Sequence, residues 1–298
     1  MNIHGREIIV RGRLLKIAGL DGEKYRFLED PEPVLAGLRR SAARADLFTF
    51  TQRLPETTPK YAYPFEWDNF AALPISTFDD WWMNQLGFKG RNKAKQAEKK
   101  GVQLREAVFD DDLVRGIWEI YNECPVRQGK PFHHYGKDLA TVRKISETFL
   151  DSSIFIGAYL GDRLIGFAKL TVDETGTQAG LMHIIAMVQH RDKAPTNALI
   201  VQAVRSCADR KIPFLVYSSF AYGAKERDSL SDFKERMGFQ RIDVPRYYVP
   251  LTRLGEMAFR LGLHRKLSER VPETLLVKLR ELRNSWYNRK LRSVTEAS

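Results

Sequence analysis

Polar side chains that could take part in chemistry are densest between residues 121 and 135. The group includes a carboxylate, a guanidinium and two imidazoles, contributed by Glu123, Arg127, His133 and His134, with Gln128 and Tyr135 beside them. Such a group can bind a polar acceptor and guide its proton, or it can be a loop held by its own hydrogen bonds, and the sequence leaves both interpretations open. Because the histidines are adjacent and no Cys-x-x-Cys or His-x-x-x-His pattern accompanies them, we predict no metal site.

A second candidate is Lys234, which lies in the segment 233–239, written FKERMGF. Attack of an amine on an ester or thioester builds an oxyanion, and an ammonium held in a dry cleft would lower that barrier by roughly 3–4 kcal/mol. The alternative is an ordinary lysine on an exposed helix surface. Phe233 precedes it, and Tyr217 and Tyr222 follow a predicted strand nearby, where they could position a substrate or pack against the core.

An alternation of strands and helices must position these residues. Short apolar runs bounded by turn signals predict strands, and apolar residues at helical spacing predict helices. The strands expected here are 154–160, 164–172, 179–188, 214–218, 240–244 and 247–251, the last two separated by Pro245. Helices are expected to start at 110–112, after the basic loop 190–193, and at 228 or 229, the last closing at Gly238.

The first 88 residues predict a small α/β unit. Strands are expected at 8–17, 24–28, 46–52 and 61–67, with helices at 33–41 and 78–86. A basic helix at 91–100 and a strand at 102–107 follow. We therefore expect three parts: a truncated N-terminal unit at 1–88, a main domain at 89–252 and a basic helical tail at 253–298.

The order of elements, with its Phe-x-x-x-x-Gly-Phe helix exit, resembles the GNAT acyltransferase fold over roughly residues 109–251. The resemblance implies an α/β (α+β) fold with a mixed, mostly antiparallel central sheet flanked by helices. In GNAT proteins the loop between the first two helices covers the acceptor site. The resemblance therefore makes Glu123 and His134 candidates to guide the acceptor, with Arg127, Gln128 and Tyr135 as contacts, and it places Tyr217, Tyr222 and Phe233 beside the acyl group.

The loop that holds coenzyme A phosphates in GNAT enzymes departs from the usual pattern. That loop normally contains glycines, which let backbone amides approach the phosphates at a helix N-terminus. Here residues 189–197 read QHRDKAPTN, with no glycine, and Pro195 lacks an amide hydrogen. Side chains would have to bind the donor phosphates instead, and the candidates are Arg191, Lys193 and Asn197.

Three features resemble the Fem aminoacyltransferase branch. They are the loss of the glycine-containing phosphate loop, a Phe-Lys pair where many GNAT enzymes have a tyrosine, and the run 91–102 (RNKAKQAEKKGV). The resemblance implies an N-acyltransferase that moves an acyl or aminoacyl group from acyl-CoA or aminoacyl-tRNA to an amine on a cell-wall precursor or sugar, with Lys234 stabilising charge. Two alternatives remain: an acetyl-CoA-dependent N-acetyltransferase with an atypical loop, and a non-catalytic module that binds RNA or an anionic membrane.

The charge distribution permits such a polyanionic partner. The 298 residues carry a net charge of +11, and residues 253–298 contain eleven Lys/Arg against five Asp/Glu. This tail predicts two amphipathic helices split by Pro272, which could bind RNA or a membrane surface, or dock on the main domain. The sequence has no run of ~18 apolar residues and no signal peptide, and its two cysteines, Cys124 and Cys207, fit free thiols in a reducing compartment. We therefore expect a cytoplasmic protein, which the tail could bring to the inner membrane face.

Overall fold

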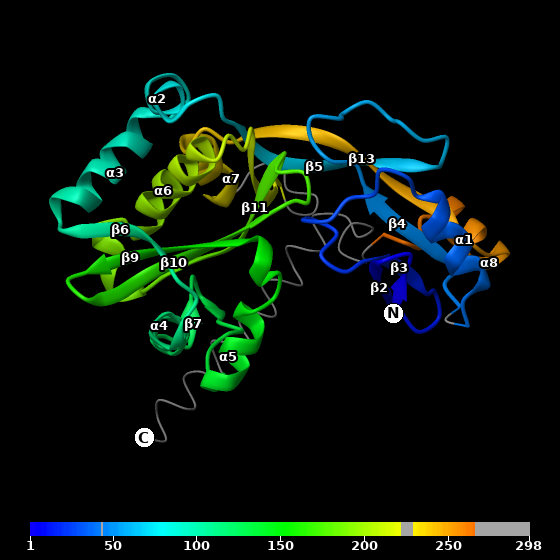
Figure 1. Cartoon of the computed structure of the whole chain (residues 1–298), viewed down its shortest axis with the longest axis horizontal. Helices are drawn as coiled ribbons and strands as arrows, with labels where there is room; N and C mark the ends of the chain where they lie inside the picture. Colours follow the sequence, from blue (N-terminus) through cyan, green and yellow to red (C-terminus); the bar gives the residue numbers. More distant parts are fainter. Residues whose placement is uncertain (43, 222–228, 266–298) are drawn as a thin grey trace.

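The computed structural model describes residues 1–42, 44–221 and 229–265. Within this part, one mixed sheet of eleven strands runs through the molecule in the order β1-β2-β3-β4-β13-β5-β12-β11-β10-β9-β6. Helices cover its faces, and the two long strands β5 and β13 cross from one half of the molecule to the other (Figure 1). The expected fold class is confirmed: a mostly antiparallel sheet flanked by helices.

The C-terminal half, residues 102–239, follows the predicted order of elements. Its strands are β6 (Val102–Ala107), β9 (Ser153–Leu160), β10 (Arg163–Val172), β11 (Gln178–Ala186) and β12 (Phe214–Ser219). The residues of β10 from Leu164 to Thr171 are buried without alternation, because helices lie on both of its faces. The small hairpin β7 (Val126–Arg127) and β8 (Lys130–Pro131) lies apart from the main sheet.

Helices pack on both faces of this half. On one face lie α4 (Asp111–Asn122) and α5 (Leu139–Ser146), whose apolar residues share a core with Phe155 and Phe167. The helix α4 begins where predicted, because the Asp110 side chain accepts the amide hydrogen of Leu113. On the other face lie α6 (Pro195–Asp209), α7 (Ser229–Arg236) and α3 (Phe88–Lys99), joined to the sheet through a second core. The connection before α3 contains α2 (Phe78–Asp80) and a π-helical turn, η1 (Trp81–Gln85).

The last strand corrects the sequence prediction. The expected break at Pro245 is absent, and β13 (Gln240–Pro250) is one continuous strand. It pairs with β5 (Phe65–Pro74) on one side and with β4 (Leu47–Thr51) on the other. Pro245 has no amide hydrogen, but this removes only one hydrogen bond from a strand that is paired along both edges. The strand expected at 61–67 likewise starts later and runs further, as β5.

The N-terminal half, residues 1–51, contains β1 (Asn2–Ile3), β2 (Arg6–Arg11), β3 (Ile17–Leu20), α1 (Glu32–Arg40) and β4. The predicted strand at 8–17 ends at Arg11, and its partner is β3 rather than residues 24–28. Those residues form no strand, because the amides of Tyr25 and Arg26 both bond to the Gly22 carbonyl in a turn. The predicted strand at 46–52 is confirmed by β4.

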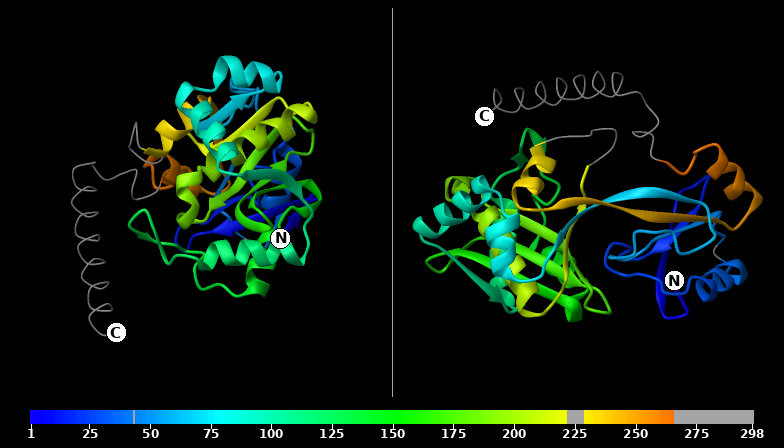
Figure 2. Two further views of the ribbon diagram at one scale, coloured as in Figure 1. Left: turned by 90° about the vertical axis from the view of Figure 1, so that its left-hand side faces the viewer. Right: turned by 90° about the horizontal axis from the view of Figure 1, so that it is seen from above.

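The two halves exchange strands. Although β5 follows β4 in sequence, it pairs with β12 of the C-terminal half, whereas β13, which follows that half, pairs with β4. Seen from above, β5 and β13 bridge the two bodies (Figure 2). The chain then enters α8 (Arg253–Arg260), where the Thr252 side chain caps the first turn. The predicted tail helices beyond residue 265 lie outside the described residues, and within the described ones no helix has the length and apolar character to cross a membrane.

Candidate functional site

The strands β11 and β12 run parallel for only three residue pairs and then separate. The last pair joins Gly180 to Val216, beyond which β11 continues to Ala186 and β12 to Ser219. The pairing of β12 with β5 is also irregular between Val216 and Ser219, and Ser218 has a positive φ of 53°. The end of β12 is therefore a strained segment at a gap in the sheet, a setting in which binding sites are common.

Lys234 lies at this gap. Its side chain is fully buried, and its Nζ donates to the Ser219 carbonyl oxygen at 2.6 Å. The ammonium also lies 4.7 Å from the centroid of the Tyr217 ring, which packs against Phe239 at 5.9 Å. Phe233 packs against the same core, whereas Tyr222 lies outside the described residues. The interpretation of Lys234 as an exposed helix lysine is therefore wrong.

Glu123 and Arg127 bind the backbone at the end of β11. The two carboxylate oxygens of Glu123 accept the amide hydrogens of Val188 and Gln189, each at 2.8 Å. Arg127 donates to the carbonyl oxygens of Ala186 and Ile120, both at 2.7 Å, and lies 3.4 Å from the Glu123 carboxylate. These contacts favour the interpretation of the 121–135 segment as a loop held by its own hydrogen bonds, since both charged groups are engaged in positioning the chain.

His134 is buried rather than presented to solvent. Its ring stacks on Tyr121 with centroids 4.2 Å apart, and its Nδ1 lies 3.3 Å from the Lys137 Nζ. Burial, together with the nearby positive charges, lowers the pKa of His134 to about 3, so its imidazole is neutral near pH 7. Gln128 occupies the turn between β7 and β8 with a positive φ of 53°, and Tyr135 is exposed. The structure does not bring these three residues together with Lys234 in one set of contacts.

The three candidate donor-phosphate residues do not converge either. Lys193 pairs with Asp192 at 3.3 Å, and the Asn197 amide donates to the Met237 sulfur at 3.3 Å. Arg191 is exposed and has no ion pair among the described residues. Arg191 and Lys193 lie in a 3₁₀ turn (Val188–Lys193), whereas Asn197 lies in the first turn of α6. Gln96 of α3 and Lys100, the residue after that helix, both donate to Asp192 in the turn. Ala194 takes the left-handed conformation, φ 51°, just before Pro195 starts α6.

Solved structures share this architecture. The crystal structure of FemX matches with a TM-score of 0.60 at 11% identity, covering 86% of this chain and 86% of that chain. The C-terminal domain of a putative lysylphosphatidylglycerol synthetase from Agrobacterium fabrum matches with 0.56 at 13%, covering 85% and 83%. The structure of L-PGS from Bacillus licheniformis matches with 0.56 at 12%, again covering 85% and 83%. The chain has a GNAT-like fold of the Fem type. No protein-family model and no curated protein sequence matches it.

In this Fem-type fold the N-terminal half reaches the gap between β11 and β12, which the sequence did not predict. The Lys24 Nζ donates to the Ser218 hydroxyl at 2.6 Å, next to the residue that holds Lys234. Tyr25 packs so closely on Gly180 that a Cβ there would lie 2.4 Å from its ring. Lys24 and Tyr25 belong to the segment 24–28, for which the sequence predicts a strand. The signal that could have indicated this contact is Gly180, because a glycine within a strand often marks the close approach of another group.

Sequence reasoning also missed Lys169, which is fully buried on the α4 and α5 face of the Fem-type fold. Its Nζ donates to the carbonyl oxygens of Ser146, at 2.8 Å, and of Thr148. Burial lowers the pKa of Lys169 to about 8. Lys169 pairs with His183 of β11, and a bulge that inserts Met182 turns His183 to the same face. Burial lowers the pKa of His183 to about 4. A basic residue inside a strand gives no periodic signal, so neither burial nor pairing could be predicted.

Proposed function

We propose that the chain is an N-acyltransferase that moves an acyl or aminoacyl group from an activated ester or thioester to an amine. The observation that carries this proposal is the burial of Lys234 at the point where β11 and β12 separate. Burying an ammonium costs free energy, and the place of this one at a gap in the sheet, rather than its burial alone, supports a role in chemistry. The low-identity structural matches support the fold on which this site is built.

The proposed reaction is balanced without a cofactor. The amine nitrogen attacks the carbonyl carbon, the carbonyl π electrons move to oxygen, and the ammonium of Lys234 stabilises the resulting oxyanion. The tetrahedral intermediate then expels the alkoxide or thiolate, which leaves with a proton that the amine loses. The Lys234 Nζ donates to the Ser219 carbonyl oxygen at 2.6 Å. That bond fixes the position of the group, and Tyr217 covers one side of it.

The proton that the amine loses needs an acceptor. Glu123 already accepts two backbone hydrogens, and His134, with a pKa lowered to about 3, is a weak base. Transfer through water or through the departing group therefore fits the described residues better than either side chain. Under this proposal Glu123 and Arg127 act as positioning residues, while His134 supports the loop by stacking.

An aminoacyl ester of tRNA is the donor that we propose, ahead of acyl-CoA. The amides of Val188 and Gln189 are taken by Glu123, the loop contains no glycine, and Lys193 and Asn197 have partners within the protein. A phosphate cradle of backbone amides is therefore poorly supported. By its name, lysylphosphatidylglycerol synthetase attaches an amino acid to its acceptor. For this chain we propose that the acceptor is an amine on a cell-wall or sugar precursor. The reaction would take place in the cytoplasm, and the basic tail would contact tRNA or anionic lipid.

A mass-spectrometric survey tests the proposal. Purified full-length protein is incubated with a set of aminoacyl-tRNAs and a set of acyl-CoAs, each against the same panel of amine acceptors, and products are detected by their mass. We expect an amide product from at least one aminoacyl-tRNA. Product from acetyl-CoA alone would establish the coenzyme A-dependent alternative. No product from any donor, together with salt-sensitive RNA binding, would contradict enzyme function and favour a binding module.

A further inference from the structure

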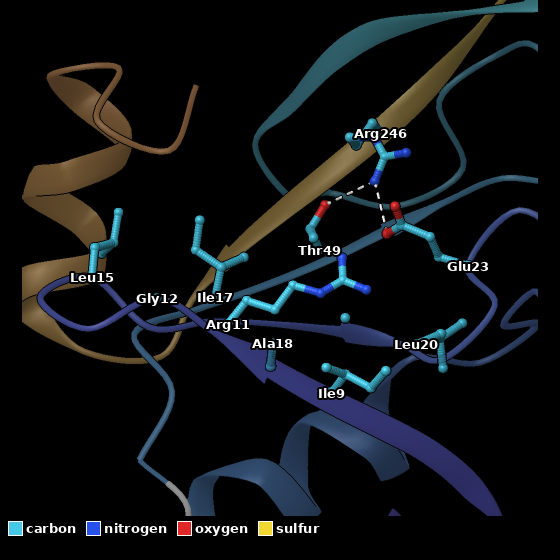
Figure 3. A pocket seen from close by; sticks show the side chains of 11 residues that line it. Ile9, Arg11, Gly12, Leu15, Ile17, Ala18, Leu20, Glu23, Thr49 and Arg246 are labelled. Atoms are coloured by element: carbon cyan, nitrogen blue, oxygen red, sulfur yellow. Dashed lines mark hydrogen bonds and ion pairs between the residues drawn. The ribbon is translucent and has the colours of Figure 1, made fainter. Parts of the chain in front are cut away.

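A cavity lies in the N-terminal half, away from Lys234. It has a volume of about 250 Å³ and lies on the sheet face opposite α1 (Figure 3). Its lining combines apolar and charged side chains. Those used below are Ile9, Arg11, Leu15, Ile17, Glu23, Thr49 and Arg246. Ligand pockets usually combine an apolar surface with a few polar groups, and this one is small enough to suit only a small molecule.

The cavity occupies the same place in its half as the gap beside Lys234 does in the other. The strand β3 reads IAGL and the start of β11 reads QAGL. Each forms a three-pair parallel ladder that ends on a glycine, Gly19 opposite Thr49 and Gly180 opposite Val216. Each is followed by a helix, α1 or α6, that leads to the paired strand. The Tyr25 ring covers Gly180, whereas Gly19 lines an open cavity.

Charges in the cavity are only partly neutralised by each other. Glu23 and Asp68 raise the pKa of Arg246, against the effect of its burial, and hold its guanidinium at 3.1 and 2.9 Å. Glu23 uses Oε2 for this pair, and its Oε1 has no partner among the described residues. Arg11 extends over the cavity towards the side where Thr49 and Glu23 lie (Figure 3). The Arg11 guanidinium also has no ion pair or hydrogen bond within the described part of the chain.

We propose that this cavity binds a small zwitterion of the amino-acid type. Its carboxylate would pair with the Arg11 guanidinium, its ammonium would donate to Glu23 Oε1, and its apolar side chain would lie on Ile9, Leu15 and Ile17. A simple anion would satisfy Arg11 but would meet the Glu23 carboxylate, and a simple cation would meet Arg11. A ligand carrying both charges satisfies both groups, and charge-assisted hydrogen bonds are the strong ones. This proposal does not depend on the transferase function.

Isothermal titration calorimetry on the full-length protein tests the site with L-leucine, L-valine and L-methionine as probes. The control ligands are 3-methylbutylamine, which is leucine without its carboxylate, and 4-methylpentanoate, which is leucine without its ammonium. We expect at least one amino acid to bind and both leucine analogues to bind at least about tenfold more weakly than leucine. Binding of none of the three amino acids, or equal binding of either analogue, would overturn the proposal.

A matched pair of variants assigns the binding to this cavity. Arg11→Met should weaken amino-acid binding at least about tenfold, because it removes a charge-assisted bond. Arg13→Met, at an exposed position just after β2 ends at Arg11, should leave binding unchanged. Thermal denaturation of both variants checks that they remain folded. Amino-acid binding that is equal in wild type and Arg11→Met would show that the ligand lies elsewhere and would overturn the assignment.

Discussion

Buried cations are the unusual feature of this chain at the scale of single residues. Lys169 and Lys234 are both fully buried, and each donates to backbone carbonyl oxygens. The bonds offset part of the cost of removing an ammonium from water, which an apolar residue in the same place would avoid. Lys169 donates to the end of α5 and to the turn before β9, whereas Lys234 stands at the gap in the sheet. The difference in place is why we assign chemistry to only one of them.

His134 makes the stability of the protein depend on pH. Its pKa falls from 6.5 to about 3 on folding because the ring is buried beside positive charges, so between these values the unfolded chain binds a proton that the folded one does not. The free energy of unfolding should therefore decrease as the pH falls below 6.5, by about 1.5–2 kcal/mol at pH 5 from this residue alone. Chemical denaturation at pH 7 and pH 5 measures the change.

Two variants isolate that contribution. His134→Phe keeps a ring against Tyr121 and should reduce the loss of stability between pH 7 and pH 5. His4→Gln changes an exposed histidine and should leave the loss as it is in wild type. An unchanged pH dependence in His134→Phe would show that His134 titrates normally in the folded protein.

At the scale of elements, the sequence predicted what local pattern controls. The strands β6 and β4, the helix α4 with its Asp110 cap, and the order of elements through β12 follow from alternation, helical spacing and capping. The errors fell where distant parts of the chain decide. Pro245 looked like a break because pairing on both edges of β13 is invisible locally, and residues 24–28 looked like a strand because their contacts lie across the molecule.

The loop after β11 depends on one carboxylate. Glu123→Gln should retain one acceptor but lose the charge that holds two amides, and we expect a loss of about 1–3 kcal/mol in local stability. Hydrogen exchange monitored by NMR should show faster exchange at the amides of Val188 and Gln189. Glu119→Gln provides the control, because Glu119 lies on α4, which ends just before Glu123, and its carboxylate is more exposed. Equal protection of both amides in Glu123→Gln would contradict this role.

At the scale of the whole molecule, the exchange of β5 and β13 ties the two halves into one sheet. Each half would lose a paired strand without the other, because β5 pairs with β12 and β13 pairs with β4. Arg53 with Asp173, at 3.0 Å, and Lys24 with Ser218 reinforce the contact between the halves. Such an arrangement could not be predicted from the sequence, because β5 has the same pattern whichever strand it pairs with. The division at residue 88 stays a prediction about sequence segments.

Unfolding should therefore be cooperative across both halves. Tryptophan fluorescence reports the five tryptophans, among them Trp81, which is buried in the core shared with the C-terminal half. Far-ultraviolet circular dichroism reports the whole sheet. We expect the two signals to change together in urea, with a single midpoint. Separate midpoints would show that one half unfolds without the other, against the consequence drawn from the strand exchange. Gly180→Ala, which would clash with Tyr25, should lower the common midpoint without splitting it.

The central claim is that the Lys234 ammonium stabilises the charge of acyl transfer. The most direct measurement is the single-turnover rate constant of amide formation, by rapid quench with the donor identified by mass spectrometry, in wild type, Lys234→Met and the exposed α5 control Lys144→Ala. We predict that Lys234→Met lowers this rate constant about 10²–10³-fold while the dissociation constant of the donor changes little, and that Lys144→Ala behaves as wild type. A folded Lys234→Met protein that transfers at the wild-type rate would contradict the account.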